Sequence, residues 1–137
     1  MLQAAIAGAE VVRRASPQHG AEIAIKGHGD YQTPIDRASE AAIAAELTRS
    51  FPNCRIHGEE HVADVQGDGD TRFLIDPIDG TTNFIWGVPF FSVAIALEEG
   101  TAFTAGVVLD PLRAEVFVAD RGHGSFFQRR AACHGSA

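Results

Sequence analysis

Apolar residues near the start of the chain follow helical spacing. Five of them recur at three- and four-residue steps over the first twelve positions: Leu2, Ala5, Ile6, Ala9 and Val12. Arginines follow at 13–14, where cations favour a helix C-terminus, and Pro17 ends the pattern. The spacing therefore predicts a first helix that stops before Ser16.

The stretch T-P-I-D at 33–36 is a start signal for a second helix. Its threonine can cap the helix, its proline suits the first helical position, and Asp36 can complete a capping box. Apolar residues then recur at four-residue steps until a proline stops the helix: Ile43, Leu47, Phe51 and Pro52. Between the two helices, 21–26 fits either a strand or a helix end, and 27–30 is typical of a turn.

From residue 73 onward the apolar period changes to that of strands. The apolar runs cover 73–75, 91–97, 102–109 and 115–119. Short polar turns connect the later runs, and such turns join antiparallel neighbours because parallel pairing needs a long crossover. We therefore expect an α+β fold, with two N-terminal helices packed on a largely antiparallel β-meander in a single domain over 1–137.

Composition narrows the class of protein. The chain has 137 residues, 45% of them hydrophobic, and a formal net charge of -7, which fits a globular domain and argues against nucleic acid as a partner. Cys54 and Cys133 form no C-x-x-C pair, so a reducing, cytoplasmic setting is the default expectation. No signal peptide or apolar run long enough for a membrane span is evident in this sequence.

The stretch HGEEH at 57–61 matches the H-x-x-E-H pattern of one class of zinc peptidases. That chemistry needs both imidazoles on one face of a helix. Because Gly58 interrupts the motif soon after the helix-stopping Pro52, we expect a strand end and a loop, with His57 and His61 not sharing a face. A functional role is then expected for Glu59 alone, and zinc-peptidase chemistry is the less favoured interpretation.

The run D-P-I-D-G-T-T-N-F at 76–84 contains the strongest chemical signal. Two aspartates follow an apolar strand, and the proline between them favours a turned path on which both carboxylates and the Ile78 carbonyl converge. Oxygen ligands of this kind suit a hard cation such as Mg²⁺. Gly80 permits close approach of a ligand, and Thr81 and Thr82 offer donors to an anion if a helix begins there. Asp79-Gly80 alone would indicate only a surface turn.

The whole run resembles the signature of the inositol monophosphatase family. The resemblance extends to Gly58-Glu59-Glu60, to the Thr33-x-x-Asp36 helix start and to the downstream strands up to residue 127. It implies the N-terminal half of that family's layered α/β sandwich. It also implies four Mg²⁺ ligands: Glu59, Asp76, the Ile78 carbonyl and Asp79.

The resemblance further implies how phosphate esters would be hydrolysed. Thr81 and Asp36 would orient the attacking water, with Glu59 as the third catalytic residue, and Asp79, Gly80 and Thr81 would contact the substrate. Metal-assisted hydrolysis neutralises the phosphate oxygens and stabilises the leaving alkoxide. The implied substrate is a small phosphorylated polyol, with inositol monophosphate favoured because Thr82 stands where other branches often have Lys. Histidinol phosphate, fructose bisphosphate and bisphosphate nucleotides stay open.

The chain departs from the family pattern in its second half. Family members are longer and carry a further metal-binding Asp in a Trp-Asp motif, whereas the only Trp here, Trp86, precedes Gly87. A truncated or frame-shifted product is therefore expected, and an inactive fragment with residual cation binding is the rival interpretation. A sheet without its usual cover would expose an apolar face and favour self-association. The resemblance also makes a homodimer an expectation.

Overall fold

The computed structural model describes residues 1–15, 24–27 and 30–129. Helix α1 (Leu2–Arg14) and helix α2 (Pro34–Ser50) confirm the two predicted helices. The T-P-I-D signal acts as predicted, because the Thr33 side chain accepts the backbone N–H of Asp36 and the Asp36 carboxylate accepts that of Thr33, 2.8 Å away. Helix α2 ends one residue before Phe51, which the pattern had included.

The segment between the two helices, for which a strand and a helix end were both considered, contains a small hairpin. Strand β1 (Ala24–Gly27) pairs antiparallel with strand β2 (Asp30–Gln32). The strand interpretation of 21–26 is thus correct for its last three residues. Residues 21–23, two residues of the expected turn (28–29) and the tail 130–137 lie outside the described part of the chain.

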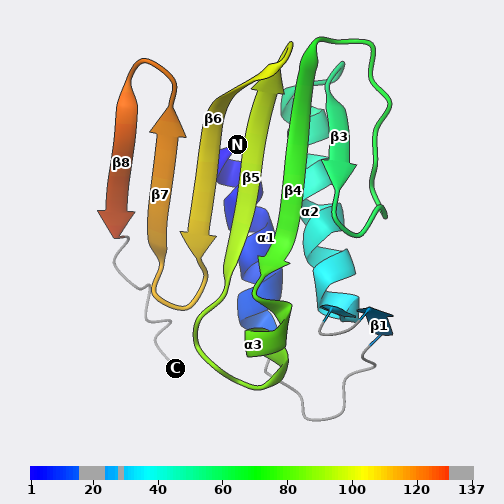
Figure 1. Cartoon of the computed structure of the whole chain (residues 1–137), viewed down its shortest axis with the longest axis vertical. Coiled ribbons are helices and arrows are strands. Elements are labelled where there is room, and N and C mark those ends of the chain that lie inside the picture. Colours follow the sequence, from blue (N-terminus) through cyan, green and yellow to red (C-terminus); the bar gives the residue numbers. More distant parts are fainter. Residues whose placement is uncertain (16–23, 28–29, 130–137) are drawn as a thin grey trace.

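A six-stranded sheet follows in the order β3-β4-β5-β6-β7-β8 (Figure 1). Its strands are β3 (Arg55–Gly58), β4 (Thr71–Asp79), β5 (Ser92–Glu99), β6 (Ala102–Asp110), β7 (Glu115–Asp120) and β8 (Gly124–Arg129). The four predicted strands are confirmed with shifted ends, and all neighbours from β4 to β8 are antiparallel as expected. Two features were not predicted: β8, and the parallel pairing of β3 with β4.

Both long helices lie on one side of the sheet (Figure 1). The hydrophobic core includes Phe73, Ile95 and Val107 from the sheet and Ile43 and Leu47 from α2. Within the described residues no helix crosses the opposite side, where Val108 and Phe117 stay exposed. Among the described helices none is long and apolar enough to cross a membrane.

Candidate cation site at the end of strand β4

The two aspartates of the D-P-I-D run lie on strand β4, not on a turn after it. Asp76 pairs with Ala94 and Asp79 with Ser92, so three steps along β4 match two steps along β5. One extra residue is therefore inserted, which is a β-bulge. In a regular strand, residues three apart point to opposite faces; the extra residue restores both aspartates to the face that carries Ala94 and Ser92.

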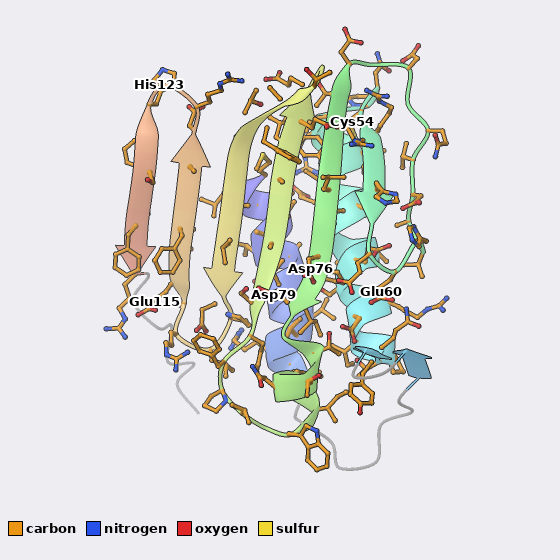
Figure 2. All side chains as sticks on the ribbon, in the orientation of Figure 1. Cys54, Glu60, Asp76, Asp79, Glu115 and His123 are labelled. Atoms are coloured by element: carbon orange, nitrogen blue, oxygen red, sulfur yellow. The ribbon has the colours of Figure 1, made fainter. Side chains whose placement is uncertain are left out.

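A side chain of helix α2 fixes the bulge by a hydrogen bond. The buried Ser39 hydroxyl on α2 donates to the Pro77 carbonyl at 3.2 Å. Ile78 is buried in the core, so its side chain anchors the bulge while the aspartates face away from the helices. Figure 2 shows Asp76 and Asp79 close to each other near the end of β4. The two aspartates therefore converge as the sequence indicated, although a bulge brings them together instead of a turn.

Glu59 is brought beside Asp76 by the parallel pairing of β3 with β4. Gly58 pairs with Ile75, and the next backbone N–H, that of Glu59, donates to the Ile75 carbonyl at 3.0 Å. The residue that follows each partner is a carboxylate, so Glu59 and Asp76 meet at the same end of the two strands. Glu59 thus comes to lie beside two aspartates that follow it by 17 and 20 positions in the sequence.

Asp76 has the electrostatics of a cation site. Burial, then the charge and hydrogen bond of Glu59 and the charge of Asp79, together raise the pKa of its carboxyl to about 8. Its Oδ1 atom is buried without a hydrogen-bond partner. A buried, unpartnered carboxylate oxygen among other acids is poorly satisfied by protein donors and well suited to a divalent cation. The residues present therefore fit Mg²⁺, with an all-oxygen donor set.

Thr81 and Asp36 also come together, although 45 positions separate them. The Thr81 hydroxyl donates to Asp36 Oδ1 at 3.1 Å and lies 2.9 Å from the Ile78 carbonyl. The other oxygen of Asp36, Oδ2, completes the α2 capping box. Asp36 is only 1% exposed, so one buried carboxylate both caps the helix and fixes the threonine.

Gly80 links the strand to helix α3 (Thr81–Ile85), so a helix does begin at Thr81, which the sequence analysis had left as a condition. Its φ of 94° lies in the left-handed region, and a Cβ there would come within 3.2 Å of the Phe90 carbonyl. The glycine is thus required for the sharp turn that carries Thr81 back toward Asp36. Helix α3 has only five residues, so any anion contact would depend on individual donors and not on a helix field.

Two hollows flank the carboxylates on the open side of the sheet. One of about 540 Å³ is lined by His57, Glu59 and Asp76 and then by small apolar residues of β5 and β6. The other, of about 450 Å³, is lined by Asp79, Gly80 and Arg113, among others. The bulge stands between them, so a ligand held by the acids could extend to either side.

One expectation about the H-G-E-E-H stretch is wrong and another is confirmed. The stretch is not helical: β3 ends at Gly58 and a turn follows, as predicted, so the helical context of a zinc peptidase is absent here. However, His57 and His61 do approach each other, with ring centroids 4.9 Å apart. The chain folds back because His61 adopts a left-handed conformation with φ of 54° and its N–H reaches the Gly58 carbonyl at 3.3 Å.

Sequence reasoning missed the residue that holds this turn. Glu40 on α2 is fully buried, and its carboxylate accepts the backbone N–H groups of Glu60 at 2.7 Å and Val62 at 2.9 Å. Figure 2 shows Glu60 beside α2. A signal was present, because Glu40 lies four residues after Asp36 and three before Ile43, on the stripe of α2 that is otherwise buried.

The fold and the carboxylate cluster together define a class of protein. The chain is an α+β protein with two helices behind a mostly antiparallel sheet, and its oxygen-only carboxylate cluster lies at the end of one strand. A family model fits this description: the inositol monophosphatase family model matches residues 1–136. The chain belongs to the inositol monophosphatase family.

Individual relatives support this family assignment. The chain is 39% identical over 131 residues to an inositol-1-monophosphatase of Mesorhizobium japonicum, covering 95% of this chain and 49% of that protein. It is 46% identical over 101 residues to Nus factor SuhB of Pasteurella multocida, covering 74% and 38%. The chain thus spans about half the length of the curated relatives it matches.

Solved structures confirm the fold. The extragenic suppressor protein SuhB of Bartonella henselae superposes with a TM-score of 0.87 at 39% identity, covering 96% of this chain and 52% of that one. The Thermotoga maritima IMPase superposes with a TM-score of 0.77 at 30% identity, covering 99% and 53%. The α+β fold predicted from the sequence is thereby confirmed.

Proposed function

We propose that this chain contributes the cation and water-positioning residues of a Mg²⁺-dependent phosphomonoesterase acting on a small phosphorylated polyol, inositol monophosphate first. The observation that carries the proposal is the bulge that turns Asp76 and Asp79 to one face, beside Glu59, with a buried Asp76 oxygen lacking a partner. Family membership supports phosphatase chemistry in general, and the substrate and the metal are the finer part of the proposal.

The residues that would hold Mg²⁺ are Glu59, Asp76, Asp79 and the Ile78 carbonyl. When bound, the metal would neutralise the phosphate oxygens and favour loss of the alkoxide. Asp76 would be deprotonated on binding, because its pKa of about 8 is that of the crowded, metal-free cluster. Asp79 is exposed and lines the second hollow, so it is also the acid placed to meet substrate.

The water-positioning role falls to the pair Thr81 and Asp36. The single proton of the Thr81 hydroxyl is directed to Asp36 and the Ile78 carbonyl, so the hydroxyl oxygen keeps a lone pair that can accept a hydrogen bond from a water molecule. Because Asp36 is buried and also capping α2, the pair is rigid before substrate arrives. Gly80, next to Thr81, leaves room for the phosphate at this point.

The test is phosphate release from inositol 1-phosphate by the purified chain, with and without Mg²⁺. Turnover is expected to need the metal and to be lost in Asp79→Asn. The matched control is Asp70→Asn, the same change at an exposed loop aspartate, which should leave turnover unchanged. Histidinol phosphate, fructose bisphosphate and a bisphosphate nucleotide form the comparison panel for substrate class.

A folded chain that binds Mg²⁺ without turnover would refute the catalytic part and favour the rival, a cation-binding chain without catalysis. Binding is therefore measured separately, by calorimetric titration of Mg²⁺ into the wild type and Asp79→Asn. Failure of Mg²⁺ to bind the folded wild type at millimolar concentration would refute the whole proposal.

A further inference from the structure

Three metal-ligating side chains converge beside the carboxylate site without belonging to it. His57 lies on β3, and His61 and Asp64 lie in the loop that follows. The Asp64 Oδ2 atom is 3.1 Å from His61 Nδ1 and 3.5 Å from His57 Nδ1. One ligand atom from each residue can be chosen so that all three lie within 4.8 Å of one another.

The carboxylate of this cluster is fixed by the backbone. Asp64 Oδ1 accepts the Gly58 N–H at 2.8 Å, which leaves Oδ2 for the two imidazoles. Outer hydrogen bonds of this kind orient metal ligands and are a regular part of metal sites. The turn that carries His61 is fixed separately, since Glu40 binds the amides on either side of it, those of Glu60 and Val62.

We propose that His57, His61 and Asp64 form a binding site for a transition-metal cation of the zinc class. The donor set is two imidazole nitrogens and one carboxylate oxygen, which suits Zn²⁺ and its neighbours and disfavours Mg²⁺. Ligands at about 2.0–2.1 Å in a tetrahedron stand roughly 3.3 Å apart, close to the separations of both His–Asp pairs. All three residues are exposed, so a fourth position is open to solvent.

The proposed site is chemically separate from the acids at the end of β4 but lies next to them. His57, Glu59 and Asp76 line the same hollow, and Glu59 stands between the two histidines in sequence. The neighbouring sites would sort cations by softness, the acids taking a hard ion and the histidines a borderline one. This inference does not rest on the proposed phosphatase activity, because it concerns metal binding by other residues.

The test is titration of Zn²⁺ and, for spectroscopy, Co²⁺ into the full chain with Mg²⁺ in excess. The variants are His57→Asn, His61→Asn and the double variant; asparagine suits position 61 because it tolerates the left-handed conformation. We expect the wild type to bind one Zn²⁺ per chain. Each single variant should bind Zn²⁺ about tenfold or more weakly, and the double variant should lose the visible Co²⁺ bands.

The chain provides a matched control in His123. Its Nδ1 lies 3.0 Å from Asp120 Oδ2, so it forms an exposed His–Asp pair, and the second imidazole is what the proposed site adds. Figure 2 shows it at the end of the sheet away from Glu60. His123→Asn should leave Zn²⁺ affinity and the Co²⁺ spectrum unchanged, as should Asp79→Asn.

Three outcomes would overturn the proposal. The first is a folded wild type that binds no Zn²⁺ when Mg²⁺ is in excess. The second is equal Zn²⁺ affinity in the wild type and the double variant. The third is loss of Zn²⁺ binding in Asp79→Asn, which would place the ion among the carboxylates. Circular dichroism of each variant checks that the fold is retained.

Discussion

The buried Glu40 should be one of the most sensitive positions in the chain. Its side chain is 0% exposed and its two oxygens accept backbone N–H groups at 2.7 and 2.9 Å. A hydrogen bond to a charged group contributes about 1.5–3 kcal/mol, and removing the charge recovers part of the cost of burying it. We therefore expect Glu40→Ala to lower the free energy of unfolding by about 3 kcal/mol.

A substitution at Gly58 should disturb the same hydrogen bonds of Glu40, because Gly58 lies against the Glu40 carboxylate. A Cβ at this position would run into the Glu40 carboxylate, which cannot move away without giving up its two hydrogen bonds. Gly58→Ala should therefore cost about as much as Glu40→Ala, because the carboxylate must leave its partners. With the carboxylate already absent, the same methyl group meets much less resistance. The double variant should thus cost little more than either single variant, a coupling of about 2 kcal/mol or more.

Urea unfolding of the wild type, both single variants and the double variant closes this thermodynamic cycle. The matched control is Glu46→Ala on the same helix, where the carboxylate pairs with Arg49 at the surface; this change should have little effect on stability. Additive effects of Glu40→Ala and Gly58→Ala, within about 0.5 kcal/mol, would refute the reasoning. So would a Glu40→Ala variant as stable as the Glu46→Ala control.

Three further predictions concern the metal, the helix start and the open face. Burial and the nearby acids raise the pKa of Asp76 from 3.8 to about 8, so this group stabilises the metal-free fold fully below the unfolded value and loses that contribution as the pH rises through 8. Mg²⁺ must then displace a proton, and its affinity, measured by titration calorimetry, should rise about tenfold from pH 6 to pH 7; a pH-independent affinity would contradict this. Thr33→Ala should lower the free energy of unfolding by about 1–2 kcal/mol in urea, because its hydroxyl accepts the N–H groups of Ile35 and Asp36, whereas the exposed Thr48→Ala should be nearly neutral. The open face, with Phe117 and Phe127 exposed by 49% and 59%, should make the chain self-associate in size-exclusion chromatography, and a clean monomer at high concentration would count against this.

Much of the fold was predictable because local signals and tertiary structure agree. The capping box at Thr33 and Asp36 fixed the start of α2, and the apolar runs located four strands of the sheet. Strand β8 was missed because all six of its residues are exposed, so no alternation of buried and exposed positions marks it. The pairing of β3 with β4 was missed because a parallel neighbour leaves no turn signal between the strands.

The candidate site was predictable in its residues but not in its construction. The spacing of Asp76 and Asp79 indicated convergence, whereas the bulge that achieves it depends on the register with β5, which no local pattern contains. Glu40 escaped notice because a charge on a helix is normally solvated, and only its position on the buried stripe distinguishes it. The approach of His57 to His61 depends on the left-handed backbone conformation of His61, which residues other than glycine seldom adopt.

Helix α2 supports all three parts of the site region. Each group of the site is fixed by a buried polar contact with α2: Ser39 holds the bulge, Asp36 holds Thr81, and Glu40 holds the turn after β3. The three residues are spaced at helical intervals, so one face of one helix positions all three parts. A destabilised or displaced α2 should therefore disturb the acids, the threonine and the histidines together. We therefore expect helix packing and cation binding to be coupled, so that Thr33→Ala, which weakens the start of α2, should also weaken Mg²⁺ binding.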